Sequence, residues 1–296
     1  MTQFSEQVAY YNTAPVVLVI GCGDMGIGSA RVLGQRAPLL IVDINEEALQ
    51  KTVETLRHEG YQVSGQVCDI SDEQSVARLA ETVAAGPGVR VLAHVAAVGN
   101  TPKGWRHVMS VDLLGPHLIA RAIGPHMVPG GVAIWISSTG CYRCPVDDEV
   151  HALIDDPFQP DFEDKVVAYC GTEPDFLTAY FMAKQGLNRM SQRLALEWGP
   201  RQVRSVSLSP GLINSTMGRT GGKSLPVYDG SGEERLGTRA EKAAREVPLQ
   251  RQGTVLEIID AVAFLASDAA SFINGIDLPV DGGSTARWRS IGEIAR

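Results

Sequence analysis

Tyr180 and Lys184 lie four residues apart in TAYFMAKQGLNRM (178–190), a segment with the apolar spacing of an amphipathic helix. Four residues are about one helical turn, so the phenol and the ammonium group would lie on the same face. An ammonium group beside a phenol favours the phenolate, which can exchange a proton with an alcohol. The same spacing recurs by chance in many helices, where it is only a surface contact. Other motifs must therefore decide between catalysis and packing.

A glycine-rich stretch follows the first apolar run of the chain. Gly21, Gly23 and Gly26 satisfy G-x-G-x-x-G in VLVIGCGDMGIGSA (17–30), between a predicted strand and a predicted helix. There, glycines allow a tight turn and let the backbone approach a pyrophosphate at the helix N-terminus. The alternative is an ordinary glycine turn. The position of the motif favours a dinucleotide cofactor.

Asp43 ends the second predicted strand and bears on the choice of cofactor. A carboxylate at this position can accept hydrogen bonds from the adenosine ribose and would repel a 2′-phosphate. No Lys or Arg occurs at 21–30 or in VDINEE (42–47) to offset that repulsion. The sequence therefore favours NAD over NADP.

Short apolar runs alternate with helical patterns along the chain, which predicts a doubly wound α/β fold with a parallel sheet covered on both faces. We expect Asn45 to cap the second helix, and Ser71 and Gln74 to form a capping box at the third. The prediction is a single domain at 14–296 after an N-terminal extension at 1–13. Strands are expected at 16–21, 38–43, 61–69, 89–97, 131–138, 203–211 and 275–283, and helices at 26–35, 45–60, 71–83, 105–127, 178–198 and 255–266.

Two segments interrupt this alternation, at 141–176 (the insert) and at 216–247. Both leave from carboxyl ends of predicted strands, where ligands sit in doubly wound folds, so the second is predicted to be a substrate loop. DEVHALIDD (148–156) predicts a short helix with its apolar side inward, which Pro157 and Pro160 end. We expect the insert to cover the substrate pocket as a lid and to meet or block the surface of the Tyr180 helix. A solvated surface loop is the alternative.

The composition excludes several functional classes. The chain has 296 residues and a net charge of −8 without a basic run, so nucleic acids and anionic membranes are poor candidates as partners. No apolar stretch reaches about 18 residues, and the first residues lack a signal-peptide pattern, so a cytoplasmic protein is expected. Five cysteines fit a reduced compartment. Cys141-x-x-Cys144 lacks a second ligand pair, so no metal site is predicted; a redox pair is the other interpretation.

Taken together, these motifs resemble the short-chain dehydrogenase/reductase family. Besides the glycine loop and the Tyr180–Lys184 pair, the motifs are WISSTG (135–140), SPG (209–211) and DLPVDGG (277–283). The stretch PLQRQG…DLPVDGG (248–283) is similar to the C-terminal pattern of the family. The resemblance implies a Rossmann-type sheet of seven parallel strands in the order 3-2-1-4-5-6-7. It also implies hydride transfer between a nicotinamide and an alcohol or carbonyl carbon, in a homodimer or homotetramer.

The resemblance implies roles for individual residues. Tyr180 would be the general acid/base, Lys184 would also hold the nicotinamide ribose, and Ser138, with Ser137 as the alternative, would bind the substrate oxygen. Asp112 stands where the family usually has a catalytic Asn, whose main-chain carbonyl holds a water, and its carboxylate would stabilise the charge of Lys184. The implied cofactor contacts are Gly21, Gly23, Met25, Gly26, Asp43, Asp69, Ile70, Ala96, Tyr180, Lys184, Pro210, Gly211 and Ile213.

The chain departs from the family pattern in three further places. Gly21-Cys22 replaces the usual Thr-Gly at the start of the loop, and His94-Val95-Ala96-Ala97 replaces N-N-A-G. The distance from Ser138 to Tyr180 is about 42 residues in place of the usual dozen, which marks the insert. Some hydroxysteroid dehydrogenases of the family carry an insertion at this point.

The predicted function is that of an NAD-dependent dehydrogenase or reductase of a small secondary alcohol or ketone. A ketoreductase acting on acyl-carrier-protein thioesters is one alternative, but the segment 147–164 holds eight Asp or Glu residues and no Lys or Arg, so it would repel an acidic carrier protein. A non-catalytic nicotinamide-binding regulator is the other. Such regulators typically lose the Tyr or the Lys, and this chain keeps both.

Overall fold

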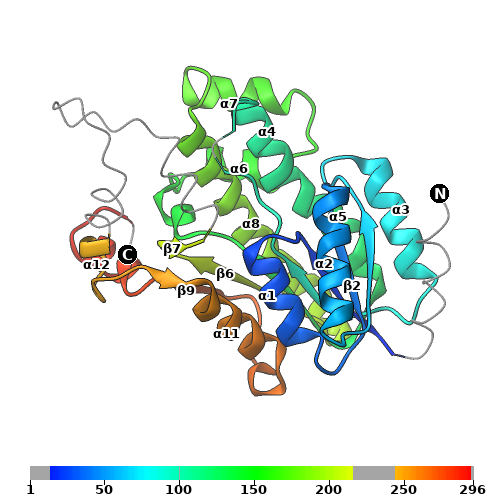
Figure 1. Cartoon of the computed structure of the whole chain (residues 1–296). Coiled ribbons are helices and arrows are strands. Elements are labelled where there is room, and N and C mark those ends of the chain that lie inside the picture. Colours follow the sequence, from blue (N-terminus) through cyan, green and yellow to red (C-terminus); the bar gives the residue numbers. More distant parts are fainter. Residues whose placement is uncertain (1–13, 100, 216–243, 295–296) are drawn as a thin grey trace.

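The computed structural model describes residues 14–99, 101–215 and 244–294 (Figure 1). Its main sheet has seven strands in the order β3-β2-β1-β4-β5-β6-β9, and every neighbouring pair is parallel. The predicted fold class and strand order are therefore confirmed. The strands are β1 (Val16–Ile20), β2 (Leu39–Asp43), β3 (Val63–Val67), β4 (Val89–His94), β5 (Met127–Ile136), β6 (Arg204–Pro210) and β9 (Asp277–Val280), with a separate short pair, β7 (Ile213–Asn214) and β8 (Gly253–Thr254).

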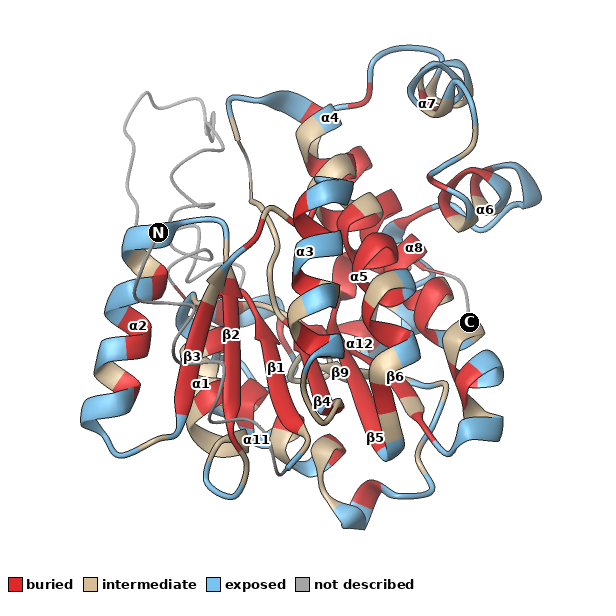
Figure 2. Ribbon diagram, turned by 90° about the vertical axis from the view of Figure 1, so that its right-hand side faces the viewer, coloured by how far each residue is buried: buried red, intermediate tan, exposed pale blue. Residues whose placement is uncertain are grey.

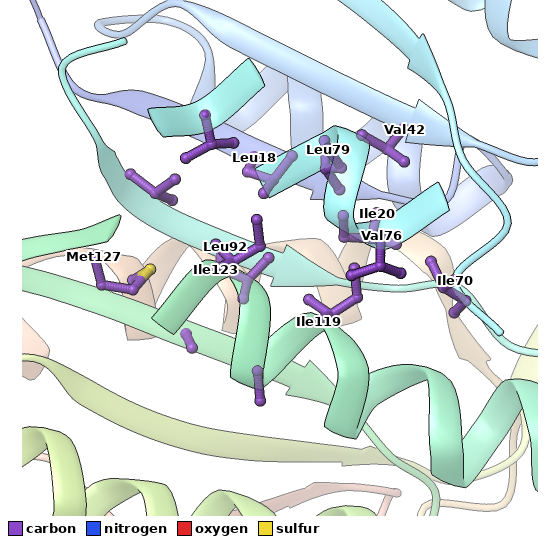
Figure 3. Packing of buried hydrophobic residues seen from close by; sticks show 14 of the residues in the cluster. Leu18, Ile20, Val42, Ile70, Val76, Leu79, Leu92, Ile119, Ile123 and Met127 are labelled. Carbon is purple, nitrogen blue, oxygen red and sulfur yellow. The ribbon is translucent and has the colours of Figure 1, made fainter. Parts of the chain in front are cut away.

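Helices cover both faces of the sheet, which explains why its strands are apolar almost throughout (Figure 2). One face packs against α1 (Asp24–Leu33), α2 (Glu46–His58) and α11 (Val255–Ala266). The other packs against α3 (Glu73–Ala84), α5 (Gly115–Ile123) and α8 (Phe176–Trp198), and Figure 3 shows part of this second core. In the described ranges, the remaining α-helices are α4 (Gly104–Met109), α6 (Asp148–Asp155), α7 (Phe162–Cys170) and α12 (Ser284–Ser290).

The helix starts confirm one predicted cap and correct another. The Asn45 side chain accepts a hydrogen bond from the Ala48 N–H at 3.0 Å and caps α2, as expected. The capping box predicted for Ser71 and Gln74 is wrong. Asp72 caps α3 by accepting from the Ser75 N–H at 2.8 Å, whereas the Ser71 hydroxyl donates to Asp69 Oδ1 at 2.6 Å.

The helix predicted at 105–127 is interrupted. A wide π-helical turn at Ser110–Leu114 separates α4 from α5, and α5 ends at Ile123. The following strand, β5, begins at Met127, earlier than predicted, because the residues VPGG (128–131) hide its start from a pattern analysis. The π-helical turn contains Asp112. Such turns are frequent at functional sites.

The insert folds into two helices beside α8. As predicted, α6 buries its apolar side (Val150, Leu153 and Ile154) and ends just before Pro157, whereas α7 was not anticipated. Figures 1 and 2 show both helices on the side of α8, away from α1, α2 and α11.

The insert and α8 are in direct contact, so the insert meets the Tyr180 helix as expected. The contact needs Gly186 on α8, because a Cβ atom there would lie 3.0 Å from the Ile154 carbonyl oxygen. Asp155 accepts hydrogen bonds from Arg189 at 2.7 and 2.6 Å and pairs with Arg193. Whether the insert also covers a substrate pocket stays a prediction.

Two predicted segments fall largely outside the part of the chain that the structure describes, namely the extension at 1–13 and the substrate loop at 216–247. Within the described ranges, none of the helices combines the length and the apolar character that a bilayer crossing requires.

Candidate active site

The carboxyl ends of the strands gather most of the predicted site residues at one edge of the sheet. Gly21 follows β1, Asp43 ends β2, Ala96 follows β4, Ser138 follows β5 and Gly211 follows β6. Parallel strands end on the same side, and their order brings β1, β4, β5 and β6 next to one another. Residues that are far apart in the sequence therefore meet at this edge.

The glycine loop fits a dinucleotide. Gly21 has a φ of +100°, and a Cβ atom there would lie 2.9 Å from the Ala96 nitrogen. A Cβ on Gly26 would lie 1.9 Å from the Gly21 carbonyl oxygen. At Gly23 a Cβ would meet no described atom within 4 Å, so the loop is tight inside and open outside. The open side faces the N-terminus of α1, where backbone N–H groups favour a pyrophosphate; Met25 lies half-buried in this first turn.

Asp43 is half-buried at the rim of the loop. Its Oδ2 accepts from the Cys22 N–H and its Oδ1 from the Asn45 N–H, both at 2.8 Å. Each carboxylate oxygen has two acceptor sites, so capacity remains for ribose hydroxyls. The same two bonds hold the carboxylate in place beside the glycine loop.

Other residues predicted to contact the cofactor have side chains engaged in the protein. Asp69 Oδ1 accepts from both the N–H and the hydroxyl of Ser71, at 2.9 and 2.6 Å. Ile70 is buried in the core near Val76 and Ile119 (Figure 3). Ile213 is also buried and pairs with β8, and Pro210 ends β6. At Ile70 and Ile213, only the main chain can therefore offer polar groups to a cofactor.

Tyr180 and Lys184 lie at different depths on α8. Tyr180 is half-buried and stacks on Phe176, with ring centroids 5.6 Å apart. Lys184 is 1% exposed, and its Nζ lies 5.5 Å from the centre of the Tyr180 ring. The ammonium group thus lies beside the phenol, as the four-residue spacing predicts.

Asp112 supplies the negative charge that a buried ammonium group requires. Its Oδ2 lies 3.5 Å from Lys184 Nζ, and its Oδ1 accepts from the Val98 N–H at 2.8 Å. Both side chains are almost fully buried. Burial raises the pKa of the Asp112 carboxyl, while the Lys184 charge and the Val98 N–H oppose the rise. The expected ionic contact between Asp112 and Lys184 is thus present.

The two candidate serines have different surroundings. Ser137 is buried, and its hydroxyl donates to the Lys184 carbonyl oxygen at 3.1 Å. Ser138 is half-exposed, and its Oγ accepts from the Gly140 N–H at 3.1 Å, which leaves its own proton available to donate. This geometry favours Ser138 over Ser137 as the residue that binds a substrate oxygen.

A buried polar network under the Ser138 loop escaped the sequence analysis. The carboxylate of Asp277, on β9, accepts from the hydroxyls of Tyr142, Ser207 and Ser209; the two serine bonds measure 2.8 and 2.9 Å. Asn188 on α8 donates to the Cys141 sulfur at 3.1 Å. The network ties the short helix after Ser138 (Thr139–Arg143) to β6, β9 and α8. A signal available in the sequence was the aspartate that begins an otherwise apolar strand.

The Cys141-x-x-Cys144 pair lacks the features of a redox site. All five cysteines are free thiols, and these two are buried. Burial raises the pKa of Cys144 to about 12 and that of Cys141 still further above its ordinary value. Because the thiolate is the reactive form, both thiols are poorly reactive, which argues against the redox interpretation.

Comparisons with known proteins show which family the chain is similar to. A family model described as enoyl-(acyl carrier protein) reductase matches residues 24–151 and 168–285, so the unmatched residues 152–167 fall within the insert. The chain is 29% identical to a D-threitol dehydrogenase from Mycolicibacterium smegmatis, over 92% of this chain and 93% of the relative. It is 27% identical to a cis-4-hydroxycyclohexanecarboxylate dehydrogenase from Sinomonas cyclohexanicum, over 96% and 98%.

Solved structures show the same fold. A levodione reductase superposes with a TM-score of 0.72 at 24% identity, covering 93% of this chain and 99% of that one. An actinorhodin polyketide ketoreductase with NADPH gives a TM-score of 0.72 at 20% identity, covering 92% and 97%.

Proposed function

Since the chain belongs to the short-chain dehydrogenase/reductase family, we propose that it is an NAD-dependent oxidoreductase of a small secondary alcohol or the corresponding ketone. The observation that carries the proposal is the buried Lys184, paired with Asp112 and adjacent to the half-exposed Tyr180. A fully buried ammonium group is costly, and its place beside a phenol at the ligand edge of the sheet accounts for that cost.

In the proposed reaction, the residues of the chain handle the proton and the substrate oxygen. In alcohol oxidation the Tyr180 phenolate accepts the hydroxyl proton, and the Lys184 ammonium stabilises the phenolate form. The Ser138 hydroxyl donates a hydrogen bond to the same oxygen as its charge develops. Bound NAD supplies the hydride acceptor. Ketone reduction reverses these steps.

Asp43 and the glycine loop support NAD as the cofactor. Gly21, Gly23 and Gly26 would hold the pyrophosphate at the N-terminus of α1, and Asp43 would bind the adenosine ribose. A 2′-phosphate would meet a fixed carboxylate, without a basic residue at 21–30 or 42–47 to neutralise it. The proposed cofactor therefore differs from NADPH, which is named with the polyketide ketoreductase.

The substrate class follows from the two named relatives, which act on a polyol and on a hydroxylated ring carboxylate. The eight acidic residues at 147–164 disfavour an acidic carrier protein as the substrate carrier. Testing therefore starts with D-threitol, cis-4-hydroxycyclohexanecarboxylate and related secondary alcohols, with NADH absorbance as the readout.

Tyr180→Phe tests the proposed chemistry. We expect at least a 1,000-fold loss of kcat with little change in the Kd of NADH, because the removed hydroxyl acts on the reacting oxygen. Tyr61→Phe, which makes the same chemical change at a residue packed on the other face of the sheet, is the matched control and should keep full activity. A Tyr180→Phe variant with a tenth of the wild-type rate would show that the acid/base assignment is wrong.

A further inference from the structure

His94 is a buried histidine for which the described part of the chain offers no hydrogen-bond partner at either ring nitrogen. It is the last residue of β4 and is 1% exposed. Its neighbours across the sheet are Ile20 on β1 and Trp135 on β5, and its ring centroid lies 5.5 Å from that of Trp135. Buried polar side chains nearly always have hydrogen-bond partners, so this ring requires an explanation.

The His94 ring lies near the Lys184 ammonium. Ile20 and Trp135 belong to the core between the sheet and α8, so His94 lies on the face of the sheet from which Lys184 approaches. Desolvation and then the positive charge of Lys184 lower the pKa of His94 to about 3. The ring is therefore neutral at working pH, with one nitrogen that donates and one that accepts.

A second buried polar atom, which contacts the same lysine, also has unused hydrogen-bonding capacity. Asp112 Oδ2 makes the 3.5 Å ionic contact with Lys184 Nζ but accepts no hydrogen bond from the described residues. Asp112 thus contacts the ammonium group from the π-helical turn, and His94 lies on the face of the sheet from which Lys184 approaches. A water molecule in a protein interior typically has about three polar partners, and these three groups supply that number.

We propose that His94 is a positioning residue which, through one buried water molecule shared with Asp112, holds the Lys184 ammonium toward Tyr180. The inference rests on the proposed function, because that function gives Lys184 its role. The charged groups that face the ring are Lys184 from α8 and, beyond it, Asp112 from the π-helical turn; β1 and β5 contribute only Ile20 and Trp135. The competing interpretation is that His94 only fills space against Trp135.

Two substitutions separate hydrogen bonding from packing. His94→Asn keeps a donor and an acceptor in the same region, whereas His94→Leu keeps apolar volume and removes both. A hydrogen bond to a charged group typically changes a rate or an equilibrium by roughly tenfold to a hundredfold. We therefore expect His94→Leu to lose at least about tenfold in kcat and to move the acid limb of kcat/KM for alcohol oxidation to higher pH, and His94→Asn to recover most of both.

A second measurement does not depend on turnover. In protein labelled with ¹⁵N-histidine and without cofactor, the His94 ring signals are assigned by their loss in His94→Asn. We expect one protonated and one unprotonated nitrogen, and a change in both signals in Asp112→Asn, because that substitution alters the shared water.

The outcomes are distinguishable. Wild-type activity and pH profile in a folded His94→Leu variant, or His94 signals that do not respond to Asp112→Asn, would overturn the positioning role. The labelled protein still gives an answer if His94→Leu does not fold. If the wild type oxidises none of the alcohols tested, the proposed function fails, while the NMR experiment still tests the contact of His94 with the Asp112–Lys184 pair.

Discussion

His117 makes the stability of the fold sensitive to acid. It lies on α5, is 8% exposed, and has Nδ1 2.9 Å from the Leu113 carbonyl oxygen and Nε2 3.5 Å from Arg193 Nη2. This geometry favours a neutral ring that donates from Nδ1 and accepts at Nε2. Desolvation, with a smaller effect of Arg193, lowers the pKa of His117 from 6.5 to about 4. A proton on the ring would therefore be bound more tightly in the unfolded chain than in the folded one.

The sign and size of the effect follow from this difference. The folded pKa of His117 is below its unfolded value, so the contribution to stability is fully present above pH 6.5 and is lost as the pH falls toward 4. At 1.36 kcal/mol for each pKa unit, the full loss is about 3 kcal/mol, of which about 2 kcal/mol is lost by pH 5. Asp112, whose pKa burial raises, has the opposite dependence on pH.

His117→Asn isolates this contribution. The Asn amide can still donate to the Leu113 carbonyl oxygen but cannot take up a proton, and other titrating groups cancel in the comparison with the wild type. Urea unfolding at pH 7 and at pH 5 gives the free energy of unfolding of both proteins. We expect the wild type to lose about 2 kcal/mol more than the variant between the two pH values. Equal losses would refute the reasoning.

Three further predictions concern charged side chains. Asp43→Ala should reduce the ratio of kcat/KM for NAD⁺ over NADP⁺ at least tenfold, because the ribose loses hydrogen bonds to a charged group; a wild-type preference for NADP⁺ would contradict this. Asp112→Asn removes the negative charge near Lys184, so the acid limb of kcat/KM should move to lower pH; an unchanged profile would argue against an ion pair. Asp155→Asn breaks the partly exposed bridges to the two arginines of α8 and should lower the free energy of unfolding by about 1 kcal/mol and speed hydrogen exchange in α6; unchanged exchange would mean that the bridges do not hold the insert.

The sheet could be predicted from the sequence because its strands are buried on both faces. A near-continuous apolar run such as 16–20 leaves little freedom of interpretation, and the position of the glycine loop identifies the first crossover. The ends of the helices were harder to predict, since they depend on single side chains. Ser71 and Asp72 are both good caps, and the structure uses Asp72, which accepts from the Ser75 N–H directly before α3 begins at Glu73. The π-helical turn at 110–114 has no pattern of its own in the sequence.

The residues of the candidate site also fall into two groups: those whose contacts follow from local spacing and those whose contacts depend on tertiary packing. Tyr180 and Lys184 share one helix, so local spacing suffices to predict their contact. The contacts of Ser137, His94 and Asp277 depend on tertiary packing, and no local pattern distinguishes a serine that donates to a backbone carbonyl from one that faces substrate. The single domain, the cytoplasmic location, the homodimer or homotetramer and the lid over the substrate stay predictions.

The place of Asp277 in the chain has a consequence for biosynthesis. This carboxylate holds Tyr142, which lies four residues after Ser138, but it belongs to β9, the last strand to be synthesised. Synthesis runs from the N-terminus, so the glycine loop and α8 leave the ribosome before this anchor, although a domain generally folds as a unit. A nascent chain that lacks β9 therefore carries Tyr180 and Lys184, but the short helix after Ser138 then keeps its contacts with β6 and α8 and lacks the carboxylate that holds Tyr142. The candidate active site is therefore complete only after β9 has been synthesised.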